Sequence, residues 1–173
     1  MSKNPDKQSD EQLRSTIKNF CQTQFGVLDT NFMCQSVSVL NPNKPITVTS
    51  DTTLANVIKR LQECKIGGVL VVDAKGVLKG IFTERDCVQK VLGKGVDLDT
   101  TPVEQYMTHD PVAQPPDITT AYALNLMSHG GFRHLPLVDQ DHVPIGIISV
   151  KDVLDFIVGS FFNDLLGFEE SVL

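Results

Sequence analysis

An internal repeat constrains the fold of this chain more strongly than any other feature of its sequence. When the 173 residues are aligned with themselves at an offset of 66, residues 45–92 match a later stretch with ten identities and no gap. Pro45 falls on Pro111, for example, and Gly80 falls on Gly146. Because a long fixed period is the signature of a duplicated structural unit, we expect two copies of one fold along the chain.

Hydropathy patterns predict the same order of elements in each copy. In the first copy, apolar residues three and four apart predict a helix over residues 53–64, and apolar runs between residues 69 and 82 predict two strands. A second helix is expected over 84–92. Four of its side chains are expected to face inward: Cys87, Val88, Val91 and Leu92. The second copy repeats these helices over 119–129 and 150–166.

The repeat therefore predicts an α/β fold (α+β in some schemes), with tandem β-α-β-β-α units packed about a pseudo-twofold axis. One such unit is too small for a robust core, whereas two packed units can share one. We assign residues 1–36 to an N-terminal extension with a helix over about 11–24. Residues 37–95 form the first domain, and residues 96–173 form the second domain with a C-terminal helical extension.

Composition and charge exclude several classes of protein. Apolar residues make up 41% of the chain and charged residues 21%, which is typical of a globular protein. The 21 acidic residues outnumber the 15 basic ones, whereas a nucleic-acid-binding protein needs a basic face. The N-terminus lacks the apolar core of a signal peptide, and no run approaches the roughly 18 apolar residues of a membrane helix. We expect a cytoplasmic protein that contacts neither nucleic acid nor a membrane.

The cysteines and histidines do not form a metal-binding pattern. The four cysteines contain no C-x-x-C pair, and the four histidines contain no H-x-x-x-H or H-E-x-x-H pattern. We expect the cysteines to be small buried apolar residues in a reducing cytoplasm, and we expect no metal site.

One motif occurs twice where a strand meets a helix, at residues 80–86 and 146–152. Its pattern is G-h-h-[ST]-x-[RK]-D, where h is an apolar residue. One interpretation is structural. The hydroxyl caps the helix, and the acid three residues later completes a capping box.

The same residues also suit a ribonucleotide. Unpaired N–H groups at a helix N-terminus attract a phosphate, and a hydroxyl there adds a hydrogen bond. The carboxylate can accept two hydrogen bonds from a ribose diol, and the basic residue supplies positive charge. These roles fall on Thr83, Arg85 and Asp86 in the first copy and on Ser149, Lys151 and Asp152 in the second.

The doubled unit, closed in each half by this motif, resembles the cystathionine β-synthase (CBS) domain pair, also called a Bateman module. The segment Phe132-Arg-His-Leu-Pro-Leu-Val-Asp139 closely matches the middle of such a domain, and residues 65–73 match it more weakly. The resemblance covers about residues 36–160. It implies two clefts between the halves that bind adenosine ligands, and a regulatory role without catalysis.

The resemblance also implies which residues line each cleft. The first cleft would be lined by Ile46, Ile66, Gly67 and Gly68, facing Ile147, Ser149 and Asp152, with His134 near a phosphate. The second cleft would be lined by Val112, Phe132, Arg133 and His134, facing Ile81, Thr83 and Asp86.

The two copies differ at one point of the clefts, because Gly67-Gly68 stand where the second copy has Arg133-His134. We expect the glycines to remove side chains from the rim of the first cleft, which either admits a bulkier ligand or weakens binding. The second cleft, with Arg85 and Arg133, is expected to be the more positively charged and to bind phosphate-bearing ligands more tightly. Alternatively, Arg133 pairs with a surface acid and His134 is a packed core residue.

The leading functional hypothesis is a non-catalytic sensor that requires no cofactor. It would bind AMP, ADP or ATP as its ligand. NAD and S-adenosylmethionine are alternatives, since both carry adenosine. Such a sensor regulates a partner protein that the sequence does not identify. A scaffold module with empty clefts is a competing hypothesis. An enzyme is disfavoured because the sequence has no nucleophile–base pair, metal cluster or G-x-x-x-x-G-K-[ST] loop.

The last helix predicts self-association. Apolar residues surround most of it, interrupted mainly by Asp155, Asn163 and Asp164. They are Val153, Leu154, Phe156, Ile157, Val158, Phe161, Phe162, Leu165, Leu166 and Phe168. Because a monomer would leave much of this surface in water, we expect a symmetric homodimer with this helix at or near the interface. Alternatively, the N-terminal helix over 11–24 covers the patch within one chain.

Overall fold

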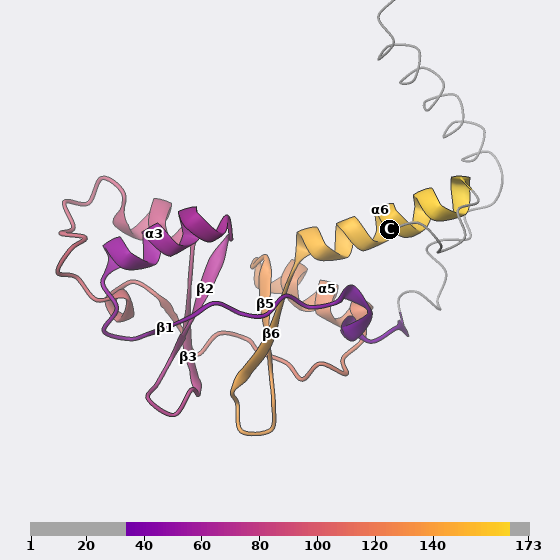
Figure 1. Cartoon of the computed structure of the whole chain (residues 1–173), viewed down its shortest axis with the longest axis horizontal. Helices are drawn as coiled ribbons and strands as arrows, with labels where there is room; N and C mark the ends of the chain where they lie inside the picture. The colour runs from indigo at the N-terminus through magenta and orange to yellow at the C-terminus, as the bar shows by residue number, and fades with distance from the viewer. Residues whose placement is uncertain (1–33, 167–173) are drawn as a thin grey trace, which may run out of the picture.

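The structure is a computed structural model that describes residues 34–166, with the side chains of the last helix described as far as Gly159. The chain forms two halves that lie side by side, each with a small sheet and helices packed against it (Figure 1). The helix expected over residues 11–24 lies outside the described residues.

The first half follows the predicted order of elements. These are β1 (Thr47–Thr49), α3 (Leu54–Cys64), β2 (Gly68–Val72), β3 (Leu78–Thr83), α4 (Glu84–Asp86) and the π-helical turn η2 (Cys87–Val91). β1 pairs in parallel with β2, and β2 pairs antiparallel with β3. Helix α3 begins where Thr53 Oγ1 accepts the N–H of Asn56, and it ends at Lys65 in the left-handed conformation (φ 52°).

The second half repeats this order 66 residues later. Its elements are α5 (Thr120–Gly130), β5 (His134–Val138), β6 (Pro144–Ser149) and α6 (Val150–Leu166), after η3 (Val103–Gln105) and β4 (Thr108–His109) in the connection. The first strand of this copy is reduced to a parallel bridge between Gln114 and Leu137, at the positions that correspond to Val48 and Val71. The predicted fold of two β-α-β-β-α units is confirmed.

The leading segment of each copy packs against the other half. Val37, in η1 (Val37–Leu40), is fully buried in the core of the second half and donates its N–H to Ile118 O at 2.9 Å. Val103 is fully buried in the core of the first half and donates its N–H to Thr52 O at 2.8 Å. In Figure 1 the indigo segment starts beside α5 and crosses to β1. The halves therefore exchange one segment each.

The glycine of the repeated motif makes room for these exchanged segments. A Cβ added at Gly80 in β3 would overlap the Met107 side chain, which comes from the segment that leads into the second half. A Cβ added at Gly146 in β6 would lie 3.2 Å from the Cβ of Pro42, which comes from the segment that leads into the first half. Glycine at this position therefore allows two chain segments to pack closely, because it has no side chain.

The helix expected over residues 84–92 differs from its prediction. Only α4 is α-helical, and the chain continues as the π-helical η2. Cys87 is half-buried and Val91 is buried, but Val88 is 62% exposed and Leu92 is 70% exposed. The prediction that Val88 and Leu92 face inward is wrong, because this short segment touches the core along one narrow stripe.

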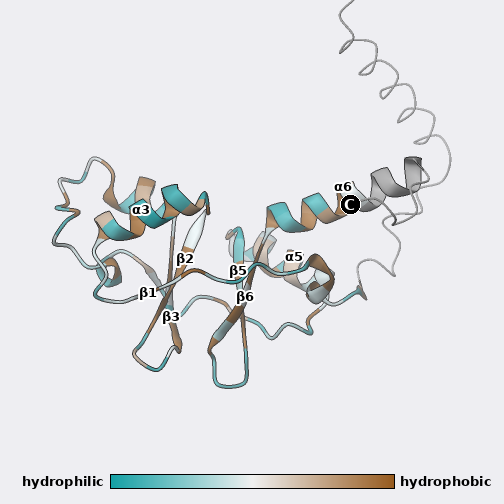
Figure 2. Ribbon diagram, viewed as in Figure 1, coloured by the Kyte–Doolittle hydropathy of each residue, from teal (hydrophilic) through white to brown (hydrophobic). Residues whose placement is uncertain are grey.

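Hydropathy follows the fold. In Figure 2 strand β6 is largely hydrophobic, and the turn that joins it to β5 is hydrophilic. Among the helices of residues 34–166, none combines the length and apolar character needed to cross a bilayer.

Cys34 and Cys64 are exposed free thiols, so the prediction that the cysteines are buried is wrong for both. Cys64 is the last residue of α3, where the helix leaves the core.

Candidate functional site

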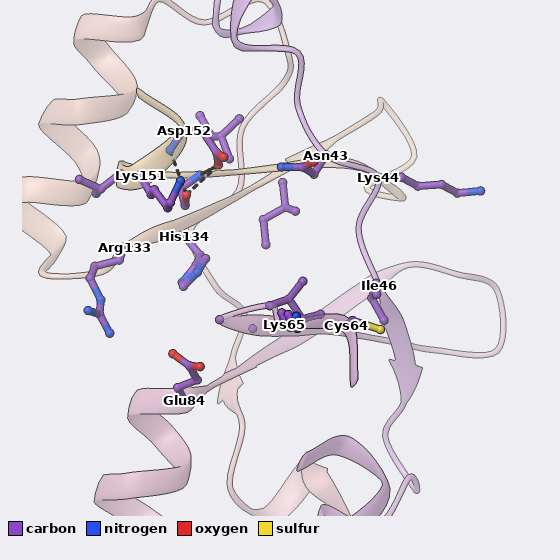
Figure 3. Close-up of a pocket in the computed structure, with 17 residues that line it drawn as sticks. Asn43, Lys44, Ile46, Cys64, Lys65, Glu84, Arg133, His134, Lys151 and Asp152 are labelled. Carbon is purple, nitrogen blue, oxygen red and sulfur yellow. Dashed lines mark hydrogen bonds between the residues drawn. The ribbon is translucent and has the colours of Figure 1, made fainter. Parts of the chain in front are cut away.

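A cavity of about 540 Å3 lies between the halves at the position predicted for the first cleft. Every residue predicted for this cleft lines it: Ile46, Ile66, Gly67, Gly68, His134, Ile147, Ser149 and Asp152, together with Lys151 of the motif. Figure 3 shows Asp152 of the second half on one side, Ile46 of the first half on the other, and His134 between them. The structure thus brings the predicted residues together, and their role in binding stays a prediction.

The second cleft is a smaller cavity of about 270 Å3. It is lined by all of the residues predicted for it: Ile81, Thr83, Arg85, Asp86, Val112, Phe132, Arg133 and His134. Because Arg133 and His134 line both cavities, the two clefts meet at this pair of residues.

Several residues that line the clefts were not predicted. In the first cleft they include Asn43, Lys44, Cys64, Lys65 and Glu84, and in the second cleft they are Thr108, Asp110 and Pro111. Most of these residues belong to the exchanged segments or follow a helix end. The offset of 66 could have indicated part of the set, because it pairs Lys44 with Asp110.

Ser149 and Asp152 form a polar corner of the first cleft at the start of α6. Asp152 Oδ2 accepts hydrogen bonds from the Ser149 N–H at 2.6 Å and from the Ser149 hydroxyl at 2.7 Å. The Asp152 N–H donates to Ser149 Oγ at 3.2 Å, which completes a capping box. Among the described residues, no group donates a hydrogen bond to the other carboxylate oxygen, Asp152 Oδ1.

Thr83 and Asp86 form the same capping box at the second cleft, with different surroundings. Asp86 Oδ2 accepts from the Thr83 N–H at 3.0 Å and from the Thr83 hydroxyl at 2.6 Å. Asp86 Oδ1 accepts from Lys90 Nζ at 2.8 Å and from the Thr108 hydroxyl at 3.4 Å. Burial raises the pKa of Asp86, but the hydrogen bonds from Lys90 and Thr83 outweigh it and hold this pKa below its ordinary value. Asp86 is therefore an ionised acid with its own counter-ion.

His134 fills the space beside Gly67. A Cβ added at Gly67 would lie 2.7 Å from His134 Nε2. An imidazole from the opposite half therefore occupies the place beside Gly67, and the expected effect of the two glycines on ligand size or affinity stays a prediction. Burial lowers the pKa of His134 below its ordinary value of 6.5, and the nearby Arg133 lowers it further, against the opposing charges of Glu84 and Asp152. This shift favours the neutral form of the ring at pH 7.

The basic residues of the repeated motif have partners within the protein. Arg85 Nη1 donates a hydrogen bond to Gly131 O across the halves, and Lys151 pairs with Asp155 one turn further along α6. Arg133 has no ion-pair partner among the described residues, and Figure 3 shows it at the opening of the first cleft, extending toward Glu84.

The charges of the two clefts differ from the expectation. The first cleft is lined by the basic residues Lys44, Lys65, Arg133 and Lys151 and by the acidic residues Glu84 and Asp152. The second cleft is lined by the basic residues Arg85 and Arg133 and by the acidic residues Asp86 and Asp110. The prediction that the second cleft is the more positively charged is wrong, because Arg133 serves both clefts and the unpredicted lysines lie at the first.

The chemistry of the first cleft suits a small ligand with a flat apolar part, hydroxyl donors and an anionic group. Its isoleucine walls are apolar, Asp152 offers an acceptor, and Arg133 offers a cation with no ion-pair partner in the described part of the chain. Within residues 34–166, no three His, Cys, Asp or Glu side chains gather so that they could hold a metal ion.

Comparison with known proteins points to one family. The family model of the CBS domain matches this chain twice, at residues 37–93 and 103–159. An uncharacterised 17.7 kDa protein of Acidianus ambivalens is 34% identical over 121 residues, which cover 70% of this chain and 72% of that protein. The CBS domain-containing protein CBSCBSPB5 of Arabidopsis thaliana is 37% identical over 120 residues, which cover 69% of this chain and only 22% of that protein.

Solved structures show the same fold. The CBS-domain containing protein ATU1752 from Agrobacterium tumefaciens matches with a TM-score of 0.63 and 35% identity, over 70% of this chain and 97% of that one. The CBS domain pair of protein MJ0100, solved in complex with 5′-methylthioadenosine and S-adenosyl-L-methionine, matches with a TM-score of 0.65 and 23% identity. That match covers 73% of this chain and 98% of the other, and it concerns the fold alone.

Proposed function

The chain belongs to the CBS-domain family, and from that premise we propose that it is a regulatory protein without catalytic activity that binds an adenosine-containing ligand in the clefts between its halves. The observation that carries this proposal is the first cleft. Its volume of about 540 Å3 falls within the range of about 300–1,000 Å3 typical of small-molecule sites. Its acid, Asp152, is oriented by Ser149 and keeps one oxygen open toward a ribose diol.

AMP, ADP and ATP are the ligands that the charges of the first cleft favour. Arg133, which has no ion-pair partner among the described residues, would neutralise phosphate oxygens that adenosine alone lacks, and Lys65 adds a positive charge to the same lining. S-adenosylmethionine and NAD remain alternatives, and the CBS pair of MJ0100 is an example of this fold with an adenosylmethionine ligand.

Self-association is a second proposed function, and a separate observation favours it. Val88 and Leu92 of the first half are 62% and 70% exposed, and their repeat counterparts Leu154 and Val158 in α6 are 56% and 42% exposed. Two apolar pairs at equivalent positions therefore face solvent, which is the pattern that a second copy of the chain could cover. We place these residues at or near the interface of a homodimer in the cytoplasm, where the exposed thiols would stay reduced.

Thermal unfolding with AMP, ADP, ATP, NAD and S-adenosylmethionine tests the proposed ligand class. A ligand at 100 times its Kd should add about 2.7 kcal/mol to the free energy of unfolding, which corresponds to about 5–10 °C in Tm for a chain of this size. Cytidine monophosphate serves as the control for phosphate binding alone. If no adenosine ligand raises Tm above this control, the proposal is wrong.

Cys64 provides a readout specific to the first cleft, because it lines that cleft and is exposed. We expect bound ligand to protect it from alkylation, while Cys34, which is exposed and lines neither cleft, stays reactive. Asp152→Asn should weaken this protection about ten- to a hundredfold in ligand concentration, the scale of a hydrogen bond to a charged group. Asp141→Asn, which is exposed in the turn between β5 and β6 and lies outside both clefts, is the matched control.

A further inference from the structure

The two clefts offer a ribose very different carboxylates, although the repeat gives both the same motif. An ionised carboxylate has about four lone-pair positions. Asp86 uses them all, since Thr83 donates twice to Oδ2 and Lys90 and Thr108 donate to Oδ1. Among the described residues, Asp152 receives hydrogen bonds only at Oδ2, where Ser149 donates twice.

Lys90 is fixed in place by more than its ion pair. Its Nζ lies 2.8 Å from Asp86 Oδ1, 3.0 Å from Tyr106 O, 3.4 Å from Met107 O and 3.4 Å from Thr108 Oγ1. The last three acceptors belong to the exchanged segment that leads into the second half and packs against the first. Lys90 therefore holds Asp86 and the wall of the second cleft together.

The lysine belongs to the first copy alone, because the offset of 66 places Phe156 at the corresponding position of α6. The second copy thus has no basic residue one turn beyond its acid. Asp86 is 8% exposed, whereas Asp152 is half-buried. The hydrogen bonding of the two acids therefore differs because their sequences differ: a lysine follows Asp86 by four residues, and a phenylalanine follows Asp152.

We propose that Lys90 competes with the ribose for Asp86, so that an adenosine ligand fills the first cleft before the second. This inference rests on the proposed function and assigns an order to its two sites. A ribose hydroxyl is a neutral donor, whereas the Lys90 ammonium adds the Coulomb attraction of a full positive charge to its hydrogen bond with the carboxylate. The ribose must therefore displace Lys90 from Asp86 in the second cleft, whereas in the first cleft it meets an open oxygen.

Calorimetric titration of the full chain with AMP measures the order directly. We expect a tight and a weak step, with the weak Kd at least about tenfold higher, the scale of one hydrogen bond to a charged group. Cys64 should become protected from alkylation with the tight step. Asp152→Asn should weaken the tight step about ten- to a hundredfold and leave the weak step unchanged.

The decisive variant is Lys90→Met, made in the Asp152→Asn background, where binding at the first cleft is weakened and alkylation of Cys64 reports that cleft separately. We expect Lys90→Met to tighten AMP binding at the second cleft about tenfold or more, because one acceptor position on Oδ1 of Asp86 becomes open to the ribose while Thr108 keeps the other. The same change should create discrimination against 2′-deoxy-AMP, which a purely structural role of Lys90 would not do. Lys59→Met is the matched control, since Lys59 also pairs with an acid four residues away, Glu63, on an exposed helix face.

The outcomes separate this inference from the proposed function. Two AMP sites of equal affinity, or protection of Cys64 only at the weak step, would overturn the order of filling and leave the proposed function intact. If Lys90→Met does not fold, these two wild-type measurements decide the question on their own. No binding of AMP or of any other adenosine ligand would overturn both.

Discussion

At the scale of single residues, Gly67 and His134 depend on each other across the two halves. The imidazole lies where any side chain at position 67 would have to be, 2.7 Å from the place of a Cβ. Because His134 lines both clefts, its position affects both sites at once. A side chain at position 67 would therefore displace His134 and change the shape of both clefts.

Gly67→Ala should lower the free energy of unfolding by about 1–3 kcal/mol, the usual cost of inserting a methyl group into a packed site. It should also weaken ligand binding, because His134 must move. Denaturant unfolding measures the loss, and Gly159→Ala in α6, where no described side chain lies within 4 Å of the added Cβ, serves as the control and should show no loss. A loss of the same size in a His134→Ala background would contradict the explanation, since the ring would then be absent.

The lowered pKa of His134 predicts how stability depends on pH. Because the folded protein binds this proton less readily than the unfolded chain, whose histidine has a pKa of 6.5, unfolding takes up a proton in acid. The free energy of unfolding should therefore fall as pH drops below about 6.5 toward the lower pKa of the folded state. Denaturant unfolding at several pH values between about 7.5 and 5 should show this fall in the wild type and a smaller one in His134→Gln.

At the scale of elements, local signals predicted the helices that carry their own caps. The expected helices over 53–64 and 119–129 agree with α3 and α5 to within a residue or so, because Thr53 and Thr119 accept the N–H groups that start them. The segment after Asp86 could not be predicted in the same way. Its π-helical turn and the exposure of Val88 depend on packing against the other elements, which the apolar spacing does not contain.

The exposed apolar pairs predict the oligomeric state. Wild-type protein at tens of micromolar should sediment at about twice the chain mass of 19.0 kDa. Val88→Asp and Leu154→Asp, alone or together, should shift the protein toward the monomer, because a charge in an apolar interface is costly. Ile145→Asp is the control, since Ile145 is 49% exposed at the start of β6, outside these pairs. A wild-type mass of one chain would contradict the homodimer.

At the scale of the whole molecule, the repeat predicted two equivalent halves but not their exchange of segments. The sequence around Val37 and Val103 indicates that both residues are apolar. It does not indicate which of the two cores each residue packs into. The same limit explains why Lys44 and Asp110 were not predicted at the clefts. They lie on the crossing segments, and their place follows from the packing of one half against the other.

The exchange predicts that the halves unfold together. Val37→Ala should destabilise the second half directly and Val103→Ala the first, each by about 2 kcal/mol for the lost methyl groups and the cavity they leave. Because each half supplies part of the other's core, either variant should lower the single midpoint of denaturant unfolding for the whole chain. Val39→Ala, in the same η1 turn but 42% exposed, should have little effect. If Val37→Ala instead split the curve into an early and an unchanged late transition, the halves would be independent folding units and the exchanged segments would be peripheral to stability.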